Sequence, residues 1–249
     1  MRTRTLPGNI HRFFAPDLAA AEIPAAAAEA HHAAGVLRLK AGEIVELFDG
    51  RGGVATGPIV RIGRGEMIVA AQERKQLHRA GPAVCLGFAV PKGKRLDWLL
   101  EKATELGAAA LQPVIFERSV AGGDEMTESK SQKWLVHCLA AAKQCGLNFL
   151  PELRPPLPLS QFLASATAAT SLNILGDLGE RALGMKAALE RRGPGQDICL
   201  LVGPEGDLTD AERQSAVAAG FLPVRLGHTV LRVETAAVAL LSAVMAMCE

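Results

Sequence analysis

The stretch Ile198-Cys-Leu-Leu-Val-Gly-Pro-Glu-Gly-Asp-Leu-Thr-Asp-Ala-Glu-Arg213 decides the fold of this chain. Its apolar run from Ile198 to Val202 predicts a buried strand, and Thr209 followed three residues later by Glu212 is a capping box that predicts a helix start. The turn between them holds two glycines, which can take backbone angles closed to other residues and let a ligand lie close to the main chain. The stretch therefore predicts an α/β protein, with either a ligand site or a plain connection at this turn.

A second turn of the same kind follows the next predicted strand, in residues 226–236. Two turns at the carboxyl ends of neighbouring parallel strands lie side by side, where open α/β sheets bind ligands. Neither turn has the G-x-x-x-x-G-K pattern of a phosphate loop, and no G-x-G-x-x-G follows the first predicted strand. The pair of turns therefore predicts one binding site and argues against a nucleotide phosphate as its ligand.

The rest of the C-terminal part alternates strands with helices. Its strands are continuously apolar, which predicts a parallel sheet covered on both faces. The predicted strands are 84–90, 111–116, 172–175, 198–202 and 222–226, and the predicted helices are 96–106, 129–145 and 234–247.

The N-terminal part has a different pattern. An alanine-rich helical segment before His31 is followed by approximate period-two alternation in residues 37–47, and Asp49-Gly50 is a strong hairpin signal. We expect a small β-barrel-like module in residues 1–72 and an α/β domain in residues 73–249.

Composition excludes several classes of protein. With 249 residues, 49% of them hydrophobic, the chain can bury a sizeable core. No apolar run approaches the length of a membrane span, and the N-terminus lacks the apolar core of a signal peptide, so we expect a soluble cytoplasmic protein without membrane contact. The five cysteines are scattered without C-x-x-C pairing or partner histidines, so we expect reduced thiols and no metal site.

Charge is distributed unevenly along the chain. Residues 1–95 carry 14 Lys and Arg against 8 Asp and Glu, a balance of +6, so the remainder carries 13 against 18, a balance of −5. A basic front part favours a phosphate-contacting face, although the asymmetry is modest.

Several motifs occur together: Leu201-Val-Gly-Pro-Glu-Gly206, Leu226-Gly227, Leu231-Arg232, Glu234-Thr-Ala236, Pro91-Lys-Gly93, Lys102-Ala-Thr-Glu-Leu-Gly107, Glu117-Arg-Ser119 and Gln144-Cys-Gly146. With them the chain resembles the RsmE family, whose members methylate N3 of a uridine in small-subunit (16S) ribosomal RNA. The resemblance covers nearly the whole chain. It implies an α/β fold of the SPOUT class, in which the C-terminal segment threads a loop to form a trefoil knot, with an N-terminal PUA-like β-barrel module.

The resemblance also implies S-adenosylmethionine as cofactor, bound between the two turns. Main-chain groups and apolar side chains of such turns suit adenine. The implied cofactor-binding residues are Leu175, Gly176, Leu201, Val202, Gly203, Pro204, Glu205, Gly206, Leu226, Gly227, Leu231 and Arg232.

Transfer to uracil N3 needs a proton acceptor or cations that stabilise the uracil anion. Arg118 and Arg232 are candidates for stabilising the anion, and Glu205 or Glu234 for accepting the proton. Each has a structural alternative, since the carboxylates can stabilise a helix start and Arg232 can pair with Glu234.

The implied partner is ribosomal RNA or the small ribosomal subunit, and the target base must be unpaired or extruded. The candidates for phosphate contact are Arg2, Arg4, Arg12, Arg38, Lys40, Arg51, Lys92, Lys94 and Arg95. The family usually dimerises through its C-terminal helices, and the small residues of 236–247 suit a homodimer, although burial within one chain explains them as well.

The chain departs from the family pattern in a few places. Asp207-Leu208 stands where Gly-Phe is usual, Val233 where Thr is usual, and Lys143 and Leu147 flank the Gln-Cys-Gly where Glu and Arg are common. Two other functions stay open: methylation of another RNA position, such as a ribose hydroxyl, and a non-catalytic RNA-binding role in ribosome assembly.

Overall fold

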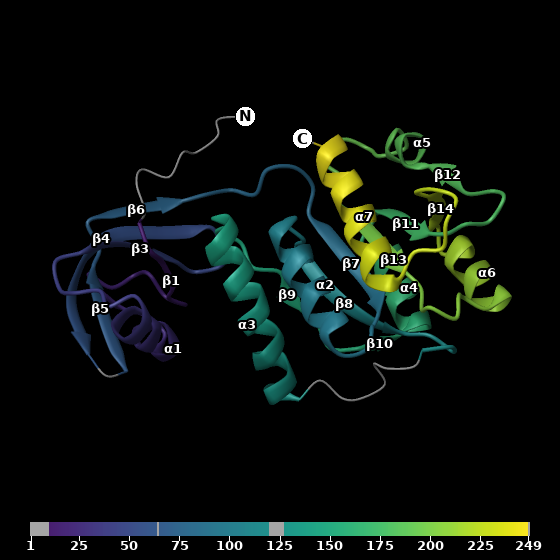
Figure 1. Ribbon diagram of the computed structural model, residues 1–249. Helices are drawn as coiled ribbons and strands as arrows, with labels where there is room; N and C mark the ends of the chain where they lie inside the picture. Colours follow the sequence, from purple (N-terminus) through teal and green to yellow (C-terminus); the bar gives the residue numbers. More distant parts are fainter. Residues whose placement is uncertain (1–9, 64, 120–126, 249) are drawn as a thin grey trace. The chain divides into compact units, whose positions relative to one another are not determined.

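The computed structural model in Figure 1 describes residues 10–63, 65–119 and 127–248. The chain forms two compact units. Within these described ranges, the first unit contains residues up to 79 together with 146–149, and the second contains residues 80–145 and those from 150 onward.

The first unit is built on a small, mostly antiparallel sheet. The long strand β4 pairs with β3 and β6 along its first half and with β5 along its second half, and a shift of register between Ile59 and Arg61 lets it serve both. The strand order is β1-β3-β4-β5-β2, and only β1 and β3 run parallel. The strands are β1 (Arg12–Phe14), β2 (Glu22–Pro24), β3 (Ile44–Phe48), β4 (Gly53–Gly63), β5 (Glu66–Ala70) and β6 (Glu73–Gln76).

Two features of this unit differ from the sequence-based expectation. The alanine-rich segment is not one helix, because Ile23 is buried in β2 and only α1 (Ala27–His31) and a π-helical turn (His32–Val36) are helical. In addition, β6 extends the sheet beyond residue 72.

A short segment from far along the sequence completes the first unit. Gly52 N donates to Asn148 O at 2.9 Å. The Arg12 guanidinium donates to Leu147 O at 3.2 Å, to Asn148 Oδ1, and to Glu46 Oε1 at 2.7 Å. Because Arg12 and Glu46 are each 8% exposed, this is a buried ion pair rather than a surface charge.

The second unit is built on a parallel sheet with the order β10-β8-β7-β13-β11-β14-β12, to which β9 adds beside β8. All of these pairs run parallel, as predicted. The strands are β7 (Val84–Ala89), β8 (Ala110–Ile115), β9 (Glu152–Leu153), β10 (Leu157–Pro158), β11 (Leu172–Gly176), β12 (Leu183–Gly184), β13 (Ile198–Val202) and β14 (Leu222–Arg225).

Helices cover both faces of this sheet, and every residue of β13 is therefore buried. Gly87 and Gly176 are one position apart in register, so they point to opposite faces. A Cβ at Gly87 would meet Phe162 of α4, and one at Gly176 would meet Leu240 of α7. The helices are α2 (Lys94–Glu105), α3 (Glu128–Cys145), α4 (Leu159–Ala168), α5 (Met185–Leu189), α6 (Asp210–Ala218) and α7 (Val233–Met247). Figure 1 shows α2 and α7 side by side in front of the sheet.

No helix in the described ranges is both long enough and apolar enough to cross a membrane. The same ranges contain no cluster of His, Cys, Asp and Glu side chains that could hold a metal ion.

Candidate functional site

A cavity of about 360 Å³ opens at the carboxyl edge of the parallel sheet. Its walls come from the ends of β11, β13 and β14 and from the beginning of α7. Its volume lies within the range of small-molecule sites, about 300–1,000 Å³. The lining residues are Gly176, Asp177, Leu178, Val202, Gly203, Pro204, Glu205, Gly206, Asp207, Leu208, Val224, Leu226, Gly227, Thr229, Val230, Leu231, Val233, Ala236 and Leu240.

The turn after β13 forms one wall of this cavity. The predicted capping box closes it: Thr209 N donates to Glu212 Oε2 at 2.9 Å, and Glu212 N donates to Thr209 Oγ1 at 3.3 Å. A Cβ at Gly203 would overlap Cδ1 of Leu208, so glycine is required there by close packing.

The expectation that the glycines supply unusual backbone angles is wrong. Neither Gly203 nor Gly206 has a positive φ, and the left-handed residue of the turn is Asp207, with φ 60°. Asn and Asp tolerate this region better than other non-glycine residues because their short polar side chains can bond locally. Here Asp207 Oδ1 accepts a hydrogen bond from Leu208 N at 2.8 Å.

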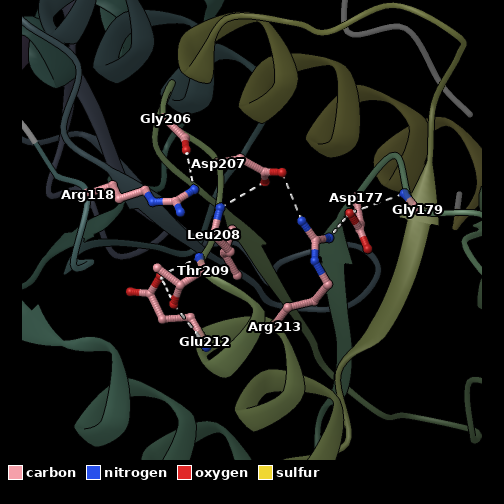
Figure 2. A network of polar contacts seen from close by, with 9 residues as sticks. All are labelled: Arg118, Asp177, Gly179, Gly206, Asp207, Leu208, Thr209, Glu212 and Arg213. Carbon is pink, nitrogen blue, oxygen red and sulfur yellow. Dashed lines mark hydrogen bonds and ion pairs between the residues drawn. The ribbon is translucent and has the colours of Figure 1, made fainter.

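Three arginines from other parts of the chain form ion pairs or hydrogen bonds with the same turn. Arg95 of α2 pairs with Glu205, Nη1 to Oε1, at 3.0 Å, and Arg118, which follows β8, donates from Nη1 to Gly206 O at 3.0 Å. Arg213 of α6 donates to Asp207 and to Asp177 (Figure 2). The hydrogen bond to Asp177 raises the pKa of Arg213 above its ordinary value, so the guanidinium stays charged.

The opposite wall is apolar. Leu226 and Leu231 are each 36% exposed and Val230 is 83% exposed, although all three are aliphatic. Exposed aliphatic side chains gathered around a cavity indicate a surface that a ligand covers. The wall ends at Arg232, the N-cap residue of α7.

Most of the implied cofactor-binding residues line this cavity. Three do not: Leu175 and Leu201 are fully buried within their strands, and Arg232 lies at its edge as a helix cap. The residues that sequence reasoning missed include Asp177 and Leu178 of the loop after β11. The predicted strand 172–175 ends just before this loop, but the acidic residue of the loop, Asp177, belongs to no motif that would have singled it out.

The four candidate catalytic residues surround the same region of the second unit. Arg118 and Glu205 are joined to the turn by the contacts above. Arg232 is exposed, and its side chain makes no ion pair or hydrogen bond with any residue that the structure describes. Glu234 is 7% exposed, and its Oε2 has no hydrogen-bond partner within the described residues, so the alternative pairing of Arg232 with Glu234 is not formed.

A second hollow lies on the other side of the start of α7. It is lined by Lys94, Arg95, Trp98, Glu234 and Thr235. Trp98 is 41% exposed there. Because Arg95 also pairs with Glu205, one ion pair lies between the two hollows.

The candidate RNA contacts have different fates. Arg2 and Arg4 lie outside the described residues. Arg12 is buried and paired with Glu46, which leaves it no face for a phosphate, so we no longer propose it for RNA contact. The exposed candidates are Arg38, Lys40, Arg51, Lys92 and Lys94, and Arg95 is half-buried.

Comparison with known proteins identifies the family. The family model described as an RNA methyltransferase domain matches residues 79–245, and one described as an RNA methyltransferase PUA domain matches residues 26–71. The ribosomal RNA small subunit methyltransferase E of Synechocystis is 31% identical over 89% of this chain and 72% of its own length. The chain belongs to the ribosomal RNA small subunit methyltransferase E family. The Mycobacterium tuberculosis member of this family is 32% identical, over 87% of this chain and 83% of its own.

Solved structures agree with membership of the methyltransferase E family. A methyltransferase of Legionella pneumophila in complex with bound SAM is 30% identical, with a TM-score of 0.84 over 96% of this chain and 98% of its own. The Neisseria gonorrhoeae family member bound to S-adenosyl methionine is 27% identical, also with a TM-score of 0.84 over 96% and 98%. The predicted fold class, a parallel α/β domain with a PUA-like module, is confirmed.

Proposed function

We propose that this chain methylates N3 of a uridine in small-subunit (16S) ribosomal RNA. The enzyme is an RNA methyltransferase of the SPOUT class, and its cofactor is S-adenosylmethionine. The observation that carries the proposal is the cavity between the two turns, which combines main-chain groups with an apolar wall in a member of this family.

The residues of the cavity fit this cofactor. S-adenosylmethionine has an adenine that accepts and donates hydrogen bonds along its edge and apolar faces that need dispersion contacts. The turn after β13 supplies main-chain N–H and C=O groups, and Leu226 and Leu231 supply exposed aliphatic surface. Gly176 and Gly203 keep side chains out of spaces that Leu240 and Leu208 occupy.

The cofactor supplies an electrophilic methyl group, and the protein must prepare the nucleophile. Uracil N3 attacks once its imide proton is removed. We assign Arg118 and Arg232 to stabilising the negative charge that develops on the uracil oxygens. Glu205 and Glu234 are the candidate proton acceptors, and the unpartnered Oε2 of Glu234 favours the latter.

The target base must leave its stack before it can react. The second hollow supports entry of an extruded base beside the cofactor cavity, because Trp98 offers a stacking face and Lys94 and Arg95 offer cations. We assign the first unit, which contains the module predicted in residues 1–72, to positioning the RNA and the second unit to catalysis. The residues proposed for phosphate contact are Arg38, Lys40, Arg51, Lys92, Lys94 and Arg95.

We further propose a cytoplasmic homodimer with a trefoil knot in the catalytic domain. Half-buried positions on α7, among them Ala239 and Ser242, support close packing against a second copy. Sedimentation of the purified protein measures the oligomeric state, and a monomer at micromolar concentration would refute the dimer.

The reaction is tested by mass spectrometry of small-subunit RNA from a strain lacking this chain, and from the same strain carrying it again. The expected result is loss and return of one N3-methyluridine. Loss of a ribose methyl group instead would favour the alternative position. Unchanged RNA, together with no calorimetric binding of S-adenosylmethionine, would favour an assembly factor.

A further inference from the structure

Arg213 joins two walls of the cofactor cavity. We propose that Arg213 is a positioning residue for S-adenosylmethionine, which acts by holding the loop after β11 and the turn after β13 at a fixed separation. The inference rests on the proposed function in that it takes this cavity as the cofactor site.

The geometry of the bridge is shown in Figure 2. Arg213 lies on the first turns of α6 and reaches back toward the cavity. Its Nη1 donates to Asp177 Oδ1, and its Nη2 donates to Asp207 Oδ2 at 2.9 Å. Asp177 and Asp207 both line the cavity but come from different strand ends. A planar guanidinium that donates from two nitrogens fixes both carboxylates at once.

The bridge has two arms, the ion pair of Arg213 with Asp177 and the ion pair of Arg213 with Asp207. The two ion pairs differ in burial, and therefore in strength. The side chain of Asp177 is 7% exposed and that of Arg213 is 27% exposed, whereas that of Asp207 is 69% exposed. An exposed ion pair is screened by water and contributes little, while a buried carboxylate deprived of its cation is strongly unfavourable. Besides Arg213, Asp177 Oδ1 accepts from Gly179 N at 3.3 Å. The ion pair with Asp177 therefore contributes most of the effect of the bridge on cofactor affinity.

The arm to Asp207 explains a departure of this chain from its family. Asp207 has a φ of 60°, a conformation that glycine adopts freely and that is unfavourable for other residues. Its Oδ1 accepts from Leu208 N and its Oδ2 from Arg213, so both carboxylate oxygens are used to hold this conformation. Compared with glycine, the aspartate adopts this backbone conformation less readily, but it adds a second attachment of the turn to α6.

Loss of the bridge should loosen the cavity before the cofactor binds. The cofactor would then have to order the two loops itself, which weakens its binding. We expect Arg213→Met to raise the dissociation constant of S-adenosylmethionine about tenfold. We expect the dissociation constant of Arg213→Lys to lie between those of the wild type and Arg213→Met, because an ammonium lacks the planar fork. Asp207→Gly removes only the exposed arm and relieves the backbone, so it should weaken cofactor binding less than Arg213→Met does.

The test is isothermal titration of S-adenosylmethionine into the full-length protein, with hydrogen exchange of residues 177–179 and 203–208 in its absence. Arg154→Met is the matched control, because it breaks an exposed pair with Glu152 at the other end of the sheet. Support requires weaker binding and faster exchange of both loops in Arg213→Met, and neither in the control. In steady-state kinetics the change should lie in KM for the cofactor rather than in KM for RNA or in kcat.

Cofactor affinity of Arg213→Met within about twofold of the wild-type value would overturn the proposal. Changes of equal size in KM for the cofactor, KM for RNA and kcat would overturn it as well. If this variant does not fold, Asp177→Asn serves in its place, since it keeps the shape of the side chain and removes the charge that Arg213 binds. Because titration needs no RNA, the proposal stands or falls separately from the identity of the methylated nucleotide.

Discussion

Gly87 lies in β7, in register with Leu201 of β13, and faces α4. A Cβ added there would lie 2.5 Å from Cζ of Phe162, whereas carbon atoms in contact are about 3.5–4.0 Å apart. The ring would have to move by about 1.0 Å, but Phe162 is only 2% exposed and has a close-packed environment. Alanine restricts the unfolded chain and gains about 0.4–1 kcal/mol, yet overpacking costs about 1–3 kcal/mol. We expect Gly87→Ala to lower the free energy of unfolding of the second unit by about 1–2 kcal/mol.

The chain provides both a probe and a control for this measurement. Its two tryptophans, Trp98 and Trp134, both lie in the second unit, so their fluorescence during urea unfolding reports on that unit alone. Gly184 has φ −74° and ψ 153°, which suit alanine, and a Cβ there would meet nothing within 4 Å. Gly184→Ala should therefore change the free energy of unfolding by less than about 0.5 kcal/mol.

A double-mutant cycle tests the proposed cause. Phe162→Leu shortens the side chain that the new methyl group meets, so Gly87→Ala with Phe162→Leu should be less destabilised than the sum of the single changes. Additive effects, or a Gly87→Ala protein as stable as the wild type, would refute the reasoning from the overlap.

Arg12→Met should lower the free energy of unfolding of the first unit by about 3–5 kcal/mol, because it leaves the buried Glu46 without its cation; faster hydrogen exchange in β3 and β4 would reveal this, and unchanged exchange would contradict it. Burial raises the pKa of the Cys138 thiol to about 11 from its ordinary value of 9.0, so as pH rises from 9 to 11 the unfolded thiol ionises while the native one keeps its proton. Stability should therefore fall across this window by more in the wild type than in Cys138→Ala, as urea unfolding at each pH would measure; parallel curves would exclude the effect. Arg232→Ala should abolish methyl transfer while calorimetry finds cofactor affinity within a few-fold, with the exposed Arg181→Ala as control; retained turnover would rule out the role of Arg232.

The sequence was informative wherever the physical signal is local. The run from Ile198 to Val202 is a strand with the predicted bounds because a continuously apolar segment can only be buried on both faces. The capping box at Thr209 formed because its two hydrogen bonds join residues three apart. A cavity was expected where two such turns lie at one edge of a parallel sheet, and the structure has one there.

Sequence patterns failed where the decisive partner is distant. The arginine at position 12 resembles any exposed cation until its carboxylate and amide partners are located, and these come from a strand and from a segment far along the chain. Likewise, Ile23 in an alanine-rich segment gives no helical period, and only pairing with β5 makes it part of a strand. The positive φ falls on Asp207 rather than on either glycine of the turn, and no sequence pattern singled this residue out.

The insertion of residues 146–149 into the first unit bears on how the protein is made. Arg12 and Asn148 are separated by 136 positions in the sequence. A ribosome delivers the N-terminal strands long before it delivers this partner, although domains commonly fold in the order of their synthesis. The nascent N-terminal module must therefore wait until the segment after α3 has emerged, because Arg12 can pair with Glu46 earlier but cannot yet donate to Leu147 and Asn148. An enzyme of this family, made by the ribosome and acting on ribosomal RNA, thus completes its N-terminal module only after more than half of its own translation.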